Sequence, residues 1–450
     1  MATRVVITGL GCVSSMGLGW GPLWNGLCEG KVALGLGTNL DAAGFRSRLV
    51  GEVPEFRAQD FVPKSYRKAV KVMARDIELA VAAAKLAVED AGLVTRGMLE
   101  SAPDATQTYP SERMGCHIGA GLIAAETDEM CAAMATARSA PGSIELDMHK
   151  WGGSSQEGAA GTGMEQLTPL WLLKYLPNML ACHVTIVHGC EGPSNTITCA
   201  EASGLLCVGE STRVIERGAA DLCFSGGLES KLNPMGMLRL DLAGFTAPTE
   251  AETDASRFAR AYDPEARGCL LGEGGGVIIL ENEATARARG AKIYAEVAGV
   301  GGGASDRAYA QGEDDEGMYN AVQNALDDAG IGADRIDAIV PLGSGIPALD
   351  RAEFGAMKRT FGDRLKDIPL VLVTPNVGMC VAGAGALQVA AGAGCLHQQK
   401  LPARVQAGRP RAGVQAGPAG VRSAALDYVL AFTGSLGGQN AAVVLKRHKP

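Results

Sequence analysis

The strongest constraint on the fold of this chain is an internal sequence repeat. Residues 83–93 read AAKLAVEDAGL, and residues 321–331 read AVQNALDDAGI. Both segments are rich in alanine and end in Asp-Ala-Gly, which predicts a helix with glycine just past its last turn. Self-similarity of this kind indicates that one structural unit occurs twice.

Two more elements follow each predicted helix in the same order. An apolar stretch runs into a G-x-G pattern at 114–121 and again at 339–345. A glycine cluster then leads into an apolar strand at 274–280 and again at 437–445. Nearly continuous apolar strands that alternate with helices indicate sheets buried on both faces.

We therefore predict two similar α/β halves, residues 1–285 and 286–450, packed with helices between them. The length of 450 residues agrees, because a single ordinary core rarely grows that large. The segment 137–166 is rich in Gly and Ser and lacks a clear period, so we expect a long loop within the first half.

Composition excludes several classes of function. The formal net charge of -8 argues against a nucleic-acid or membrane-surface partner. The sequence contains no run of about 18 apolar residues, so it predicts no membrane span. The 12 cysteines are scattered without a C-x-x-C pair, and the 6 histidines lack metal spacing. We expect a reduced, cytoplasmic protein with no metal and no cofactor.

The chain resembles the β-ketoacyl-acyl-carrier-protein synthases of the thiolase-like superfamily over nearly its whole length. The segments that carry the resemblance are VVITGLGCVSSMG (5–17), NMLACHVTIVHGCEGPS (178–194), Ser203-Gly204, FSGGLES (224–230), GEGGGVIILE (272–281) and Gly437-Gly438-x-Asn440. The resemblance implies a duplicated thiolase-like fold of αβαβα layers. It also implies a dimer that acts with acyl carrier protein in fatty acid or polyketide biosynthesis.

The family's nucleophile is a cysteine at the start of a buried helix, where the helix dipole and free N–H groups favour thiolate and oxyanion. It lies two residues before Ser-Gly in a pattern like T-A-C-x-S-G. Counting back from Ser203-Gly204 in this chain gives Glu201 at that position.

The family also uses two histidines, and neither is present here. In place of H-G-T-x-T-x-x-x-D the chain reads LGSGIPALD, which puts Leu342 at the first position. In place of G-H-x-x-G-A-x-G it reads GMCVAGAG, which puts Met379 at the second. A family lysine falls near Pro375 or Asn376.

The closing G-F-G-G-T-N pattern of the family contains a gating phenylalanine. We assign that position to Gly434, which is followed by Ser435 and Leu436. Together with Glu201, the residues Gly434 and Leu436 are the expected contacts of a bound acyl group.

With the nucleophile and both histidines replaced, the resemblance implies a subunit without condensing activity. It is similar to the chain-length factors of polyketide systems, although those carry glutamine rather than glutamate at position 201. Such a subunit shapes the acyl tunnel of an active synthase across a dimer interface that includes residues 178–200. The expected partners are an active synthase, or a second copy of this chain, and acyl carrier protein.

Two alternatives stay open. The first is an acyltransferase, hydrolase or decarboxylase that uses Glu201 on an acyl thioester, which would need a histidine or lysine within reach. The second is a homodimer that only binds acyl chains. Cys199 is off register as a substitute nucleophile, and His183 and His188 are expected to be core or interface residues.

The remaining charged candidates have structural or docking interpretations. Asp350, Glu353 and Glu273 are expected to hold backbone N–H groups or salt bridges. Five cations without an acid lie on an expected helix, and in this family that region helps to dock the acidic carrier protein. They are Lys64, Arg67, Lys68, Lys71 and Arg75. The alternative interpretation is a solvated helix face.

Overall fold

The structure is a computed structural model that describes residues 3–40, 42–153, 161–306 and 315–449. At its centre is a ten-stranded sheet whose order is β11-β14-β15-β10-β1-β9-β7-β5-β6, with the short β2 beside β1. The strands are β1 (Val5–Ser14), β2 (Gly17–Leu18), β5 (Met114–Gly119), β6 (Ser194–Ile197), β7 (Leu222–Glu229), β9 (Gly274–Asn282), β10 (Ala295–Ala304), β11 (Ala338–Val340), β14 (Tyr428–Gly434) and β15 (Gln439–Lys446).

The predicted repeat is visible in the order and direction of these strands. Outward from β1 the strands are β9, β7, β5 and β6, and outward from β10 they are β15, β14 and β11. In both series the first two pairings are antiparallel and the third is parallel. Where β6 would follow in the second series, a single parallel bridge joins Ile339 to Leu370.

The two half-sheets are joined, which the sequence did not indicate. β1 pairs along β9 on one side, and its first residues, Val5–Ile7, pair with β10 on the other. Helix α9 (Glu283–Ala288) connects β9 to β10. The predicted boundary at 285/286 falls inside this helix, and the division into 1–285 and 286–450 stays a prediction.

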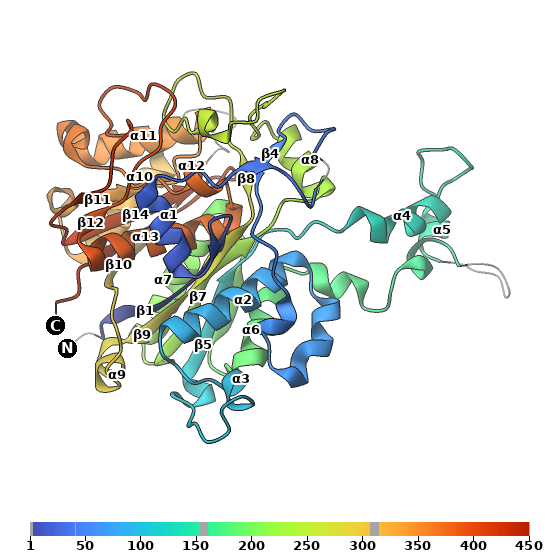
Figure 1. Ribbon diagram of the computed structural model, residues 1–450, viewed down its shortest axis with the longest axis horizontal. Coiled ribbons are helices and arrows are strands. Elements are labelled where there is room, and N and C mark those ends of the chain that lie inside the picture. The colour runs from blue at the N-terminus through green and yellow to red at the C-terminus, as the bar shows by residue number, and fades with distance from the viewer. Residues whose placement is uncertain (1–2, 41, 154–160, 307–314, 450) are drawn as a thin grey trace.

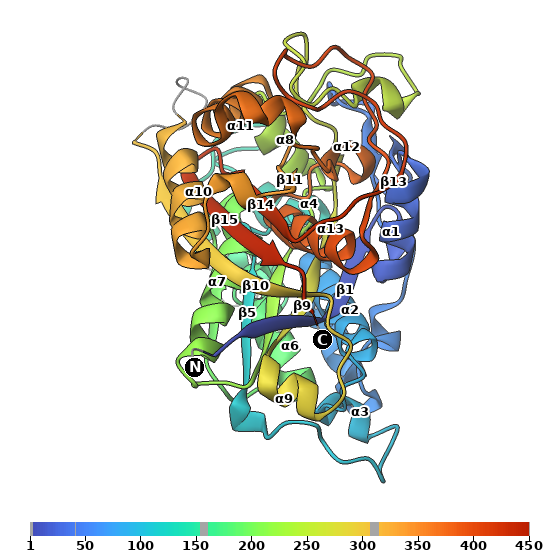
Figure 2. The ribbon, with the colours of Figure 1, turned by 90° about the vertical axis from the view of Figure 1, so that its left-hand side faces the viewer.

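Helices form three layers around the two half-sheets, as Figures 1 and 2 show. On the outer faces, α2 (Arg75–Asp90) packs on β1 and β9, and α10 (Glu316–Ala329) packs on β10 and β15. Between the half-sheets, α7 (Ser203–Glu216) and α13 (Ala384–Gln398) contact strands of both. The arrangement αβαβα confirms the predicted fold class.

Glycine in the strands allows the two outer helices to pack at backbone contact. A Cβ on Gly11 of β1 would lie 1.9 Å from the carbonyl oxygen of Ala83 on α2. A Cβ on Gly301 of β10 would lie 2.2 Å from the carbonyl oxygen of Ala321 on α10. Both alanines belong to the repeated helix sequence, so the same glycine-to-alanine contact occurs once in each half.

The other elements cover the edges of this core. The remaining α-helices are α1 (Trp20–Glu29), α3 (Arg96–Leu99), α4 (Thr127–Thr136), α5 (Met148–Trp151), α6 (Met179–His188), α8 (Pro234–Leu242), α11 (Pro347–Phe361) and α12 (Thr374–Val377). Two small sheets are formed by β3 (Gly35–Leu36), β4 (Leu49–Gly51) and β8 (Leu271–Gly272), and by β12 (Lys400–Leu401) and β13 (Arg422–Ser423). In the described ranges, no helix has the length and apolarity that a bilayer span requires.

An arm that contains α4 and α5 extends away from the body of the protein (Figure 1). The loop predicted at 137–166 lies in this arm, and part of it, 154–160, falls outside the described residues. The prediction of a plain loop was wrong for the rest, because α5, a bridge from Arg138 to Leu146 and a 3₁₀ turn at Gly163–Gln166 give it local structure.

Candidate functional site at the start of helix α7

Glu201 lies in a strained turn between a strand and a central helix. After β6 the chain enters a 3₁₀ turn, η6 (Ala200–Ala202), which continues directly into α7. Ala200 has a φ of 46°, in the left-handed region that costs a residue with a Cβ about 1 kcal/mol or more. The Cys199 N–H donates to Ser203 Oγ at 2.8 Å and closes the turn. This turn holds Glu201 in the interior, where its exposure is 1%.

Burial dominates the electrostatics of Glu201. Desolvation raises the pKa of its carboxyl group to about 7, and the nearby Glu229 acts in the same direction. Its own backbone N–H and the N–H of Leu436 oppose this shift because they favour the charged form. The Oε2 atom has no hydrogen-bond partner in the described structure. The site therefore presents one unsatisfied carboxyl oxygen.

Proton-transfer partners are not paired with this carboxyl group. Within the described ranges, no hydrogen bond or ion pair joins Glu201 to a lysine or histidine. Lys231 is the nearest candidate cation, but its ammonium forms a salt bridge with Glu229 and donates to the carbonyl of Leu122 at 2.7 Å. Lys231, which could act together with Glu201 on a substrate, is therefore already paired with Glu229.

The structure buries the two positions that replace the family's histidines. Leu342 and Met379 are each 1% exposed and belong to one apolar cluster, against which Ala200 and Leu436 also pack. The closing loop reaches Glu201 through Leu436, whereas Gly434 is the last residue of β14. The gating role of Gly434, and the contact of Gly434 and Leu436 with a bound acyl group, stay predictions.

Three predicted structural carboxylates have the contacts that we expected. Glu353 accepts the N–H groups of Leu342 and Gly343 at 2.9 and 3.0 Å. Asp350 accepts from the following residues of that loop. Glu273 pairs with Arg75 at 2.7 Å. The bonds of Glu353 and Asp350 fix the backbone around Leu342.

Near Pro375 the interior is closed. A cavity of about 10 Å³, which is about the space of one water molecule, is lined there by Cys269, Gly343 and Pro375 among others. Asn376, the other residue near the family lysine position, turns its amide to the Lys31 carbonyl. In the described structure this inner space is therefore too small for an acyl chain.

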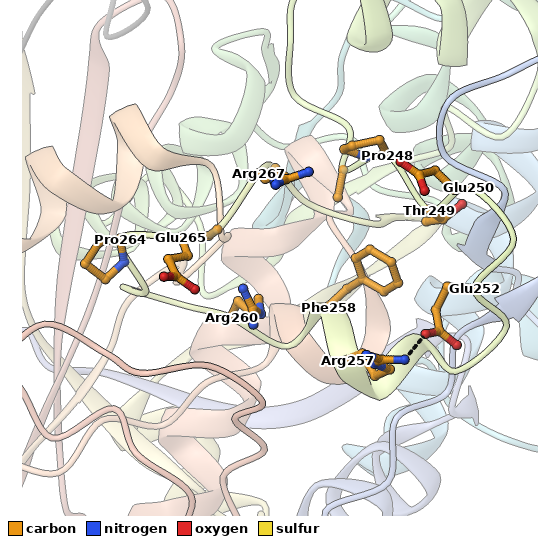
Figure 3. Close-up of a pocket in the computed structure, with 13 residues that line it drawn as sticks. Pro248, Thr249, Glu250, Glu252, Arg257, Phe258, Arg260, Pro264, Glu265 and Arg267 are labelled. Atoms are coloured by element: carbon orange, nitrogen blue, oxygen red, sulfur yellow. Dashed lines mark hydrogen bonds and ion pairs between the residues drawn. The ribbon is translucent and has the colours of Figure 1, made fainter.

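A much larger pocket, about 770 Å³, opens to the outside of this small cavity. Phe258 and Arg260 line both, so they separate the outer space from the inner one. Figure 3 shows its charged lining, where Arg257 is paired with Glu252 and Arg267 lies opposite, beside Pro248. The entrance is open and polar, while the space behind it is filled.

The cationic segment differs from the predicted helix. Lys64, Arg67, Lys68 and Lys71 lie on a 3₁₀ helix, η2 (Lys64–Val72), and all four are exposed. Arg75 is separate, because it begins α2 and is bound to Glu273. Docking of a carrier protein by the four exposed cations stays a prediction.

The two histidines and Cys199 lie in structural settings. His183 Nδ1 is 2.9 Å from the Tyr66 hydroxyl, and His188 Nδ1 is 2.8 Å from Thr95 Oγ1. Burial lowers the pKa of both histidines, to about 3 for His188. Burial raises the pKa of the Cys199 thiol, which makes it a poor nucleophile.

Sequence reasoning did not single out Glu229 and Lys231, which lie next to the site. Both belong to the FSGGLES segment and the residue after it. A glutamate at the end of a buried apolar strand, followed two residues later by a lysine, was the available signal, because a buried acid requires a partner.

Comparison with known proteins agrees with the fold and extends over both halves. The Beta-ketoacyl synthase N-terminal domain matches residues 2–286, and the C-terminal domain matches residues 294–407. A 3-oxoacyl-[acyl-carrier-protein] synthase 2 of Rhizobium meliloti is 30% identical over 460 residues, with 99% of each chain covered.

Two solved structures share the fold. The ishigamide ketosynthase/chain length factor has a TM-score of 0.82 at 24% identity, with 100% of each chain covered. The type II polyketide synthase complex AntDE:AntF, an acyl-carrier protein with its ketosynthase, has a TM-score of 0.82 at 22% identity, again with 100% of each chain covered. With both family domains matched along its length, the chain belongs to the β-ketoacyl synthase family.

Proposed function

We propose that this chain is a non-catalytic, chain-length-factor-like subunit of a type II fatty acid or polyketide synthase. It pairs with an active β-ketoacyl synthase and shapes the acyl tunnel of that partner. The observation that carries the proposal is that Glu201, at the position of the family's nucleophile, and Leu342 and Met379, at the positions of its two histidines, are each 1% exposed. A carboxylate cannot accept an acyl group as a stable thioester, and two apolar side chains cannot donate hydrogen bonds to an enolate.

The surface offers a suitable interface for that partner. The sheet ends at β6, which pairs with β5 on one side and is half-exposed along Ser194–Ile197. An open edge strand can pair with a second chain. Next to it, Ile186 on α6 is 51% exposed. These residues fall within 178–200, the expected interface.

The arm adds a large apolar surface. Its exposed hydrophobic residues are Leu122, Met134, Ile144, Leu146, Met148, Met164, Leu170, Leu172 and Leu173. Nine of the fifteen exposed large hydrophobic residues in the described parts of the chain lie in this segment, and such a concentration is expected at a protein contact. One of the two similar structures is a ketosynthase/chain length factor, and the other is a ketosynthase with its acyl-carrier protein. This supports a synthase and a carrier protein as the partners.

One observation favours the alternative enzyme that would use Glu201. Its Oε2 is unpartnered, and its pKa near 7 would suit a general base. Against this, Lys231, whose charge lowers the pKa of Glu201, forms its salt bridge with Glu229, and among the described residues no hydrogen bond or ion pair joins Glu201 to a histidine or lysine.

The test is to co-express the chain with an active synthase and to measure the complex by size-exclusion chromatography with light scattering. We expect a one-to-one heterodimer. Replacing Ile144, which is 99% exposed on the arm, with Asp should weaken it, while the exposed control Lys366→Glu should not. A stable homodimer that excludes the synthase would overturn the proposed pairing.

A second assay distinguishes the non-catalytic subunit from an enzyme that uses Glu201. The purified chain alone is incubated with acyl-carrier and malonyl-carrier thioesters, and free carrier, carbon dioxide and ketoacyl product are measured. We expect none above the rate without protein. Thioester cleavage that disappears in Glu201→Gln would establish the alternative instead.

A further inference from the structure

The arm leaves the body of the protein through a segment without regular secondary structure. Residues 120–126 follow β5 and lead into α4 without forming a helix or a strand. Further out, α4 and α5 pack against each other and against the 3₁₀ turn Gly163–Gln166, and Figure 1 shows them apart from the body. The direction of the arm therefore depends on how side chains hold the outgoing segment 120–126.

The two ends of the arm are joined at Glu129, in the first turn of α4. Its carboxylate accepts from Trp171 Nε1 at 2.8 Å and from the Tyr175 hydroxyl at 2.7 Å, and it pairs with Lys174. These three residues belong to the returning segment, η5 (Trp171–Tyr175). Because the two segments are bonded to each other here, contacts that hold the outgoing one also hold the arm as a whole.

A buried ion pair holds the outgoing segment. Lys231, which is 8% exposed, forms a salt bridge with Glu229 and donates to the Leu122 carbonyl at 2.7 Å. Glu229 accepts the Ala382 N–H at 2.9 Å, so the pair is fixed to the turn before α13. The backbone of Gly121 lies directly against it, since a Cβ there would be 1.8 Å from Glu229 Oε1. A buried ammonium group needs fixed partners, so this pair bonds the arm to the core at a defined point.

Asn233 supplies a second bond to the same segment. Its Nδ2 donates to the Ala124 carbonyl at 3.1 Å, and its Oδ1 accepts the Gly236 N–H at 2.7 Å as the N-cap of α8. Residues 231 and 233 thus hold residues 122 and 124, with the same spacing on both segments. Two bonds spaced in this way fix a direction, whereas a single bond would allow the segment to rotate.

We propose that Lys231 and Asn233 are positioning residues that fix the direction of the arm and so hold its apolar surface in the orientation that binds the synthase. The inference rests on the proposed function, because that function names the synthase as the partner. Neither residue has to touch the partner, since Lys231 is buried and Asn233 is half-buried. An arm without these bonds would adopt the binding orientation only part of the time, and the apparent Kd rises as that fraction falls.

The direction of the arm can be measured by pulsed electron double resonance between two nitroxide labels. One label is attached to Cys131, which is exposed on α4, and the other to Lys366→Cys, at an exposed position on the body. The other cysteines are buried or half-buried. We expect a single narrow distance distribution for this labelled parent and its loss in Lys231→Met and in Asn233→Asp. Asn233→Asp keeps the acceptor that caps α8 and loses the donor to Ala124.

Controls separate these bonds from general destabilisation. Lys231→Met leaves Glu229 buried without a cation, so the double variant Glu229→Gln, Lys231→Met is measured as well. It has no unpaired charge but still lacks the bond to the arm. Lys446→Met removes an ion-paired lysine on β15, and Asn282→Asp changes the N-cap of α9. Both controls should keep the narrow distribution, even if their unfolding temperatures fall.

Binding of the purified active synthase is then measured with the same variants by light scattering over a range of concentrations. We expect the apparent Kd to rise about tenfold in the double variant and in Asn233→Asp, and to stay at the wild-type value in the two controls.

The outcomes separate this inference from the proposed function. A distribution that stays narrow in the double variant and in Asn233→Asp overturns the inference, whether or not a heterodimer forms. A broadened distribution with an unchanged Kd also overturns it, because the direction of the arm would then not matter for binding. If the wild-type chain forms no heterodimer, the proposed pairing is wrong, and the distance measurement still decides whether Lys231 and Asn233 fix the arm.

Discussion

The turns that begin the two central helices have the same backbone but different side chains. In the first half, Ala200 has a φ of 46° and starts the 3₁₀ turn before α7. In the second half, Val381 has a φ of 44° and starts the turn η11 (Val381–Gly383) before α13. A cysteine directly precedes each turn. The duplication therefore extends to a strained backbone position in each half.

The next residue distinguishes the two turns. In the second half it is Ala382, whose N–H donates to Glu229 at 2.9 Å, so the turn is satisfied. In the first half it is Glu201, which is buried with an unpartnered oxygen. An unpaired buried carboxyl group costs stability. The first turn keeps a cost that its counterpart avoids, which is typical of a functional position.

The largest expected effect concerns catalysis at the first turn. Glu201→Cys should give a thiol that can be alkylated but no condensing enzyme, because Leu342 and Met379 cannot donate hydrogen bonds. The rate of ketoacyl formation should stay at least about 10³-fold below that of an active synthase, measured side by side.

Adding Leu342→His and Met379→His to that variant should still give no synthase, because the residues around the site, such as Pro375, also differ from those of the family. A Glu201→Cys variant that elongates acyl chains at the rate of the active enzyme would show that another group supplies the missing donors.

The second expected effect tests the equivalence of the two halves. Gly11→Ala and Gly301→Ala each put a Cβ within 2.2 Å of a helix carbonyl oxygen. Each should lower the free energy of unfolding by about 2–4 kcal/mol, measured in denaturant. Gly209→Ala in α7 is the control, since its Cβ meets Val300 at an ordinary 3.6 Å. If only one of the two variants loses free energy of unfolding, the helix–strand contacts of the two halves are not equivalent.

The third effect is the pH dependence that Glu201 brings to the first turn. Its pKa is about 7 when folded, above the value of 4.5 that it has unfolded. Below pH 4.5 the carboxyl group is protonated in both states and does not lower the free energy of unfolding. As the pH rises from 4.5 to 7 the unfolded state loses the proton first, so the free energy of unfolding falls. Glu201→Gln should remove that loss, so the variant gains up to about 3 kcal/mol on the wild type between these pH values.

Other buried carboxyl groups, such as Asp76 and Glu353, titrate in the same direction, so the measured quantity is the difference between variant and wild type. A difference that does not change with pH would mean that Glu201 is ionised without cost.

The smallest effect separates backbone strain from packing in the two turns. Ala200→Gly should be neutral or stabilise by about 1 kcal/mol, because glycine accepts the left-handed φ. Val381→Gly should destabilise, because Val381 is 5% exposed in the core and loses its packing. Equal changes in the two thermal unfolding temperatures would contradict the comparison.

Much of the fold could be predicted because the repeated residues are those that close helix–strand packing requires. Alanine-rich helices and strand glycines occur together in both halves, since backbone contact tolerates little else. The position of Glu201 could also be predicted, because Ser203-Gly204 lies at a fixed distance from it. The pairing of β1 with β10 could not, since apolar strands give no signal of their neighbours.

The local geometry of the site was less accessible. Glycine is the usual sequence signal of a left-handed backbone conformation, and Ala200 and Val381 do not carry that signal. The hydrogen bond from the Leu436 N–H to Glu201 could not be predicted either, because it depends on the path of the closing loop. The cationic segment was predicted as one helix, but the three-residue spacing from Lys64 to Arg67 and from Lys68 to Lys71 also suits a 3₁₀ helix, and this helix ends before Arg75.

The most direct measurement of the central claim is the product of a reconstituted complex. The chain, an active synthase, holo acyl carrier protein and malonyl-carrier are combined, and chain length is read by mass spectrometry of the carrier-bound products. The account predicts no product from the chain alone, one dominant length from the complex, and no acyl adduct on this chain. An acyl group covalently attached to this chain, or the same product lengths from the synthase with and without it, would contradict the account.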